Sequence, residues 1–318
     1  LKEGNQLIGA VFASPEGMFA IRCTVLIDAT GDAFAATLAG APVCKGREED
    51  GLMQPVSIMF TIGGVDDGRA ITGENQTYDV RTPSAADAFR KECADASTAG
   101  LLPRAAAFVR LYRATRPGEC RVNTTHANFI DATKVEDLHR AELDLRDQIP
   151  HIIDFLQLNV KGFEQCYLMD SADTLGVRET RRILGEYVLT EQDIRNSTVF
   201  DDVVVHDANF ILDVHGMRQG GQDVSEKVKD YDIPYRCLIP REVDGLLAVG
   251  RCISGTHLAS SSYRVMSIAM ALGQAGGIAG ALSVQKKVQP RELNPRDVQV
   301  ALEQAGVVLR GNSYIGMK

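Results

Sequence analysis

A polar loop follows an apolar run in the segment GLLAVGRCISGTH, residues 245–257. Gly250 has no Cβ, so a ligand can approach the main chain closely at this turn. His257 is the residue that we select as catalytic, because an imidazole exchanges protons near neutral pH. The alternative is a histidine that only hydrogen-bonds within its loop. Polar or small groups that could contact the same ligand are Arg251, Ser254, Gly255 and Thr256.

A second apolar run ends in a similar turn near the start of the chain. The segment VLIDATGDA spans residues 25–33 and places Ala29, Thr30, Gly31 and Asp32 directly after the apolar residues. Gly31 permits a tight turn, and Thr30 and Asp32 offer polar groups at its mouth. The pattern indicates a ligand-binding turn, with an ordinary turn at the end of a strand as the alternative.

Arginines are concentrated in the segment GVRETRR, which contains Arg178, Arg181 and Arg182. The fork of a guanidinium group matches a carboxylate or a phosphate, so these side chains are candidates for binding a substrate. Salt bridges to acids such as Glu179 and Glu186 are the alternative. Three further candidates on the substrate side are Tyr235, Arg236 and Arg264.

Composition excludes several classes of function. The 318 residues include 34 basic and 42 acidic side chains, and a formal net charge of −8 argues against a nucleic-acid surface. The seven cysteines form no CxxC pair, which indicates reduced, mostly buried thiols. No cluster has the spacing of metal ligands, and no GxSxG turn supports a serine hydrolase.

The apolar stretch Ser267–Val284 contains Gln274 and four glycines, which favours a packed internal helix over a membrane span. We therefore expect a small-molecule substrate, no nucleic-acid or membrane partner and a cytoplasmic location, and we leave a homo-oligomer open. The chain begins at Leu1 rather than Met, so a preceding targeting signal is left open as well.

Hydrophobic patterns predict an α/β fold with an inserted α+β module. Strands are expected at residues 25–29 and 246–249, in the same sheet. Helices are expected at 135–160, with an interruption at Pro150, and at 267–287 and 294–306. The predicted domain boundaries place a first cofactor-binding part at 1–45, the insert at 46–234 and a second cofactor-binding part at 235–318.

Five segments carry a resemblance to known flavoproteins. Residues 25–33 and 246–259 resemble the second and third FAD-contacting segments of the two-dinucleotide-binding-domain, glutathione-reductase-like flavoproteins. More narrowly, the chain resembles the bacterial FAD-dependent oxidoreductase family. That resemblance lies in GVRETRRILGEYVLT at 176–190, YDIPYRCLIP at 231–240 and GRCISGTHLASSSYRVMSIAMALGQAGGIAG at 250–280.

The resemblance implies FAD as the cofactor and hydride transfer between flavin and a small organic substrate. It places the flavin beside His257 and its phosphates beside the two glycine turns. The residues implied for cofactor binding are Ala29, Thr30, Gly31, Asp32, Gly250, Arg251, Ser254, Gly255 and Thr256. The alternative is a truncated or degenerate relative that binds no flavin and serves as a binding or structural domain.

One family feature is not found in these residues. Such flavoproteins begin with a strand, a GxGxxG turn and a helix whose N-terminus holds the pyrophosphate, and no GxGxxG occurs at the start of this sequence. The glycines at 273–280 lie inside a predicted helix and do not supply that turn. We therefore expect residues 1–318 by themselves to retain little FAD.

Overall fold

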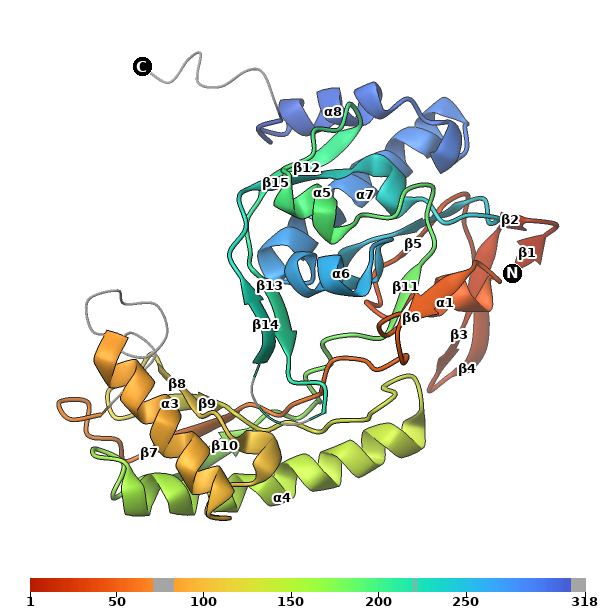
Figure 1. Ribbon diagram of the computed structural model, residues 1–318. Coiled ribbons are helices and arrows are strands. Elements are labelled where there is room, and N and C mark those ends of the chain that lie inside the picture. Colours follow the sequence, from red (N-terminus) through yellow and green to blue (C-terminus); the bar gives the residue numbers. More distant parts are fainter. Residues whose placement is uncertain (71–82, 219, 221, 310–318) are drawn as a thin grey trace. The chain divides into compact units, whose positions relative to one another are not determined.

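The computed structural model describes residues 1–70, 83–218, 220 and 222–309 (Figure 1). The chain folds into two compact units, which we call unit 1 and unit 2. Unit 1 consists of Leu1–Leu52, Glu179–Asp213 and Ser225–Lys318, and unit 2 consists of Met53–Arg178 and Val214–Val224.

These boundaries differ from the domain boundaries that the sequence suggested. Residues 179–213 and 225–234 were expected in the insert, and they belong to unit 1. Tertiary contacts are the reason: β11 (Arg181–Ile183) pairs with β6 (Val43–Lys45). Strand β12 (Val203–Ala208), which pairs with β15 (Tyr231–Pro234), packs against helices α7 (Met266–Lys286) and α8 (Pro295–Gln304). The assignment of one part to the cofactor and the other to the substrate stays a prediction.

A parallel strand pair positions the predicted site in unit 1. Strand β5 (Leu26–Asp28) pairs with β16 (Leu246–Ala248), with Leu26 opposite Leu246 and Asp28 opposite Ala248. The prediction that these two strands share a sheet is confirmed. Because the strands are parallel, both end at the same edge, and the two glycine turns that follow them lie side by side.

Helix α7 (Met266–Lys286) packs against this strand pair through its small residues. A Cβ added at Gly276 would overlap Val249 Cγ1, and one added at Gly280 would lie 3.2 Å from Ile27 Cδ1. The expected close approach of helix and sheet is confirmed. Among the described residues, α7 is also the helix whose length and hydropathy would suffice to cross a membrane.

Alanine substitutions in α7 are expected to have opposite effects at two adjacent glycines. Gly276→Ala should lower the free energy of unfolding by about 1–3 kcal/mol, because the new methyl group overpacks against Val249. Gly277→Ala is the matched control, since nothing lies within 4 Å of its added Cβ. It should stabilise the helix by up to about 1 kcal/mol. Urea denaturation measures both; equal effects would contradict this packing.

The remaining elements of unit 1 surround the strand pair. Strands β3 and β4 form a hairpin around Pro15, with Ser14 opposite Gly17. The helix predicted at 294–306 is α8, which begins at Pro295 with Asn294 as its cap. The bounds are β1 (Lys2–Glu3), β2 (Gln6–Leu7), β3 (Gly9–Ser14), β4 (Gly17–Arg22), α1 (Phe34–Leu38), α5 (Glu191–Arg195), η2 (Tyr235–Leu238), η3 (Gly250–Cys252), α6 (His257–Tyr263), η4 (Pro290–Glu292) and α8 (Pro295–Gln304).

Unit 2 is built on a four-stranded antiparallel sheet in the order β10-β7-β9-β8. Its helices supply Ile152, Phe155 and Leu156 to a core that also contains Phe60 and Leu111 of the sheet. Strands β13 (Leu212–His215) and β14 (Gln222–Glu226) pair and contain residues of both units. The other bounds are β7 (Phe60–Gly63), α3 (Pro83–Thr98), η1 (Arg104–Ala106), β8 (Arg110–Arg113), β9 (Cys120–Asn123), α4 (Val135–Asn159) and β10 (Tyr167–Ser171).

Helix α4 runs without a break through Pro150, so the predicted interruption there is wrong (Figure 1). Proline removes one hydrogen bond of the helix ladder, which by itself favours a break. Here Ile149, Ile152 and Ile153 on either side of the proline are buried in the core of unit 2. Packing of this apolar face compensates for the missing bond.

Candidate active site

The two glycine turns at the edge of the strand pair have the geometry that only glycine adopts readily. Gly31 has φ 76° and Gly250 has φ 77°. The buried carboxylate of Asp28 organises the first turn. It accepts hydrogen bonds from the Thr30 main-chain N at 3.1 Å, from Thr30 Oγ1 at 2.6 Å and from the Ala36 N at 2.9 Å.

Arg251 ties the second turn to the first. Its Nε donates to the Gly31 carbonyl at 2.8 Å, and its Nη2 donates to Asp32 Oδ1 at 2.6 Å. Asp32 also accepts a hydrogen bond from Thr180 Oγ1 at 2.7 Å. The Arg251 side chain is 29% exposed, so it is held within unit 1 and still open to a ligand on one side.

The loop after the second turn leads directly into a short helix. Thr256 is the N-cap of α6, with its Oγ1 accepting from the Ala259 N at 3.1 Å. His257 is therefore the first residue of a helix. Ser254 and Gly255 are buried, and Ser254 Oγ accepts a hydrogen bond from the Gly185 N at 3.0 Å. Contact of these two residues with a cofactor stays a prediction.

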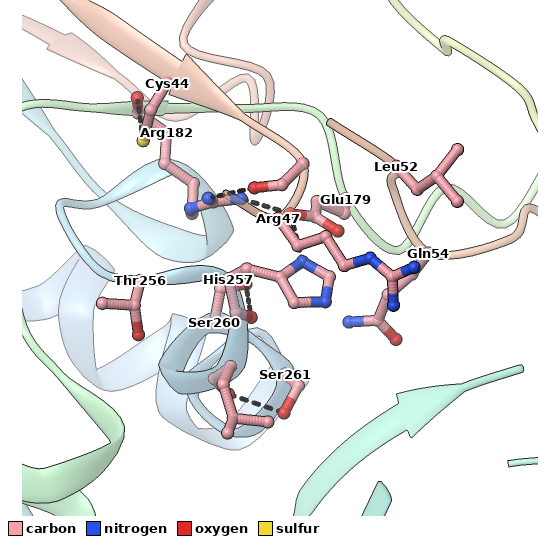
Figure 2. Close-up of polar contacts among 12 residues, drawn as sticks. Cys44, Arg47, Leu52, Gln54, Glu179, Arg182, Thr256, His257, Ser260 and Ser261 are labelled. Carbon is pink, nitrogen blue, oxygen red and sulfur yellow. Dashed lines mark hydrogen bonds and ion pairs between the residues drawn. The ribbon is translucent and has the colours of Figure 1, made fainter. Parts of the chain in front are cut away.

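A carboxylate orients the His257 ring. His257 Nδ1 lies 2.9 Å from Glu179 Oε1, and Figure 2 shows the two side chains facing one another. An ionised carboxylate only accepts hydrogen bonds, so Nδ1 carries a proton and Nε2 is the nitrogen left to exchange one with another group. The side chains are 12% and 2% exposed respectively, which shields the pair from water.

Arg182 holds that carboxylate in place. Its Nη1 donates to Glu179 Oε1, its Nε donates to the Gly255 carbonyl at 2.9 Å, and its Nη2 donates to the Gly46 carbonyl at 3.0 Å (Figure 2). Burial acts to lower the pKa of Arg182, but Glu179, Tyr263 and Cys44 together act in the opposite direction and the pKa is raised. The guanidinium is therefore charged and stabilises Glu179 as a carboxylate.

The other predicted arginines of this segment have partners of their own. Arg178 belongs to unit 2, where its Nη1 donates to the Pro55 carbonyl at 2.7 Å. Arg181 belongs to unit 1, and its Nε donates to the Asp32 carbonyl at 2.9 Å beside the first turn. Of the three, Arg181 is thus the one that contacts a glycine turn.

Tyr235 and Arg236 have protein partners away from the two turns. The Tyr235 hydroxyl donates to the Pro290 carbonyl at 2.8 Å, and burial raises its pKa. Arg236 Nε donates to Asp202 Oδ2 at 2.9 Å, and its guanidinium lies over the Tyr187 ring. Their part in binding a substrate stays a prediction.

Arg264 is a buried ion-pair residue at the end of α6. Its Nη2 lies 3.1 Å from both the carbonyl oxygen and the Oδ2 of Asp213. Burial lowers the pKa of Arg264, although Asp213 acts in the opposite direction. A role in substrate binding stays a prediction for this side chain too.

Glu179 is the functional residue that the sequence interpretation missed. It was considered only as a salt-bridge partner of the neighbouring arginines. An acid among three arginines in an otherwise acidic chain was the available signal. Which side chain the acid would orient depends on the packing of residues 179–182 against residues 254–257, and those segments are more than 70 residues apart in the sequence.

The cysteines and the serines of α6 contact main-chain carbonyls around this arrangement. All seven cysteines are free, five of them buried, as expected of reduced thiols. Burial raises the pKa of Cys252, beside the second turn, to about 11, which keeps this thiol protonated. Ser260 Oγ donates to the His257 carbonyl rather than to the ring. Within the described part of the chain, no group of three or more His, Cys, Asp or Glu could hold a metal.

A parallel strand pair that ends in two glycine turns at one edge is typical of α/β proteins that bind nucleotide cofactors. The chain belongs to the FAD dependent oxidoreductase family, whose model matches residues 1–302. Comparisons with curated proteins and with solved structures gave no significant match. The protein is thus an FAD-dependent oxidoreductase, and the match over nearly the whole chain does not favour a structural domain without flavin chemistry.

Proposed function

We propose that the edge of the β5–β16 pair binds FAD and that the enzyme transfers a hydride between flavin and a small organic substrate. Family membership supports FAD as the cofactor. The geometry fits the phosphates, because Ala29 and Thr30 are exposed at the first turn and the Arg251 guanidinium lies against that turn. At Gly250 the nearest atom to an added Cβ is Ala269 Cβ at 3.9 Å, so a ligand has room to approach the backbone.

The other residues proposed to bind FAD differ in their exposure to solvent. Gly31, Asp32, Arg251 and Thr256 are half-buried and can contact a ligand directly. Ser254 and Gly255 are buried, and they would act by positioning the start of α6. The Gly255 backbone packs closely on Tyr263, since an added Cβ would lie 2.6 Å from its ring.

His257 is the group that we propose to move a proton during the reaction. FAD supplies a hydride acceptor or donor when bound. A substrate that gives up a hydride from carbon also gives up a proton from its adjoining hydroxyl or amine, and His257 Nε2 accepts that proton. Glu179 then stabilises the imidazolium through Nδ1–H. The pairing of His257 with the buried Glu179 is the observation that carries this assignment.

A direct test is the flavin content of the purified protein. Extraction followed by chromatography should identify FAD, and anaerobic addition of small hydroxy acids, amines and dicarboxylates should identify the donor that bleaches the flavin absorbance. A preparation that binds no FAD on titration, from the complete gene product, would overturn the proposal.

In the complete gene product, Arg251→Ala is expected to weaken FAD binding about tenfold or more. A charge-assisted hydrogen bond to a phosphate contributes about 1.5–3 kcal/mol. The free energy of unfolding should change by less than about 1 kcal/mol, because the pair with Asp32 is partly exposed. Fluorescence titration with FAD and urea denaturation measure the two effects.

Asp32→Asn separates two explanations for that result. If Arg251 contacts a phosphate, removing the competing carboxylate should leave FAD binding equal or tighter. If Arg251 acts only by ordering the first turn, Asp32→Asn should weaken binding as much as Arg251→Ala does. Unchanged FAD affinity in Arg251→Ala would remove this residue from the cofactor site.

A further inference from the structure

Unit 2 contains a cavity of about 780 Å³, a volume usual for a small-molecule site. Its lining comes from five separate segments of unit 2. The side chains that matter here are Arg104 of η1, His126 and Asn128 after β9, Asp144 of α4 and Arg218 after β13. We call this space the unit 2 cavity.

His126 forms a fixed, uncharged part of the wall. Its Nδ1 lies 3.1 Å from the Ala105 carbonyl, which can only accept, so Nδ1 carries the proton. Its Nε2 lies 3.2 Å from Nδ1 of His215, and the two rings pack edge to face. Burial, with the nearby Arg178 and His215, lowers the pKa of His126 well below its usual value. The imidazole is therefore neutral at physiological pH.

The charge of the lining is therefore set by two arginines and one aspartate. Asp144 is exposed, and its Oδ1 accepts a hydrogen bond from Gln148 Nε2 at 3.3 Å. Arg104 is exposed, and its guanidinium makes no ion pair or hydrogen bond with any other described residue. Arg104 therefore gives the lining an available guanidinium fork, beside the second arginine, Arg218.

We propose that the unit 2 cavity binds a small organic anion whose carboxylate or phosphate group pairs with Arg104 and Arg218. The neutral His126 leaves this charge preference unchanged, because its two ring nitrogens already face the Ala105 carbonyl and His215. The amide of Asn128 supplies a polar contact. Asn128 is oriented for that purpose, since its Nδ2 donates to the Gly216 carbonyl at 2.6 Å. Binding of this kind requires no flavin and goes beyond the oxidoreduction proposed above.

Isothermal titration of the whole chain with succinate and with glycerol 3-phosphate tests this proposal. Each has a neutral counterpart of similar size, butane-1,4-diol and glycerol. At least one anion should bind, and its neutral counterpart should bind at least about tenfold more weakly, since a charged partner strengthens each hydrogen bond. Which anion binds decides between a carboxylate and a phosphate.

Two variants locate the bound anion. Arg104→Ala should weaken binding about tenfold or more, whereas Asp144→Asn should strengthen it a few-fold by removing a repelling charge. Arg116→Ala is the matched control, because Arg116 is a 78% exposed arginine of the same unit outside the cavity lining. Equal affinity in Arg104→Ala and the wild type, or no binding of either anion, would overturn the proposal.

Discussion

Glu179→Ala is expected to lower the free energy of unfolding by about 3–5 kcal/mol, one of the two largest effects predicted for this chain. The substitution leaves the Arg182 guanidinium buried and charged without its carboxylate. Only 4% of the Arg182 side chain is exposed, so water cannot replace the lost partner. Urea denaturation of the variant and the wild type measures the difference.

A double variant distinguishes the effect of an unpaired charge from the effect of lost side-chain volume. Glu179→Leu combined with Arg182→Met removes both charges, and it should be more stable than Glu179→Ala. It should remain less stable than the wild type, because the Gly46 and Gly255 carbonyls lose their donors. Arg251→Ala is the control for removing a partly exposed arginine. If Glu179→Ala costs no more than that control, the buried pair is not a stabilising element.

His257→Ala is expected to slow flavin reduction about a hundredfold or more, the range typical of a lost proton-transfer group. The affinity for FAD should change only a few-fold, because the ring is assigned to the proton and not to the cofactor phosphates. Anaerobic stopped-flow measurement of the flavin absorbance gives the rate, with a donor that reduces the wild-type enzyme. Fluorescence titration gives the affinity.

Two further variants control this prediction. Ser260→Ala removes a hydroxyl that contacts the His257 carbonyl and leaves the ring intact, so the rate should stay near the wild-type value. Glu179→Gln keeps the shape of the acid and removes its charge, so the rate should fall and its pH profile should shift. A wild-type rate in His257→Ala would limit this residue to a structural role.

Local patterns were sufficient for much of unit 1. Two apolar runs, each ending in a glycine, predicted β5 and β16, because a buried parallel strand needs apolar residues on both faces. The small residues of α7 predicted its close packing, since Gly276 and Gly280 face Val249 and Ile27. The patterns that predicted these features consist of residues that are neighbours in the sequence.

The domain boundaries and the course of α4 required the tertiary structure. Residues 179–213 belong to unit 1 because β11 pairs with β6 and β12 packs against α7 and α8, all far away in the sequence. Helix α4 continues through Pro150 because the flanking isoleucines are buried against the rest of unit 2. Proline alone favours a break, and only the surrounding core reverses that preference.

For the site, the sequence by itself determined the candidate groups: two glycine turns, a histidine that follows one of them and a set of arginines. Only the tertiary structure decided what these groups do. In the folded chain, Arg251 pairs with Asp32 and the buried Arg182 pairs with Glu179. Glu179 also contacts the His257 ring. The physical reason is that an ion pair forms with whichever opposite charge the fold brings within reach, and segments more than 70 residues apart meet only after folding.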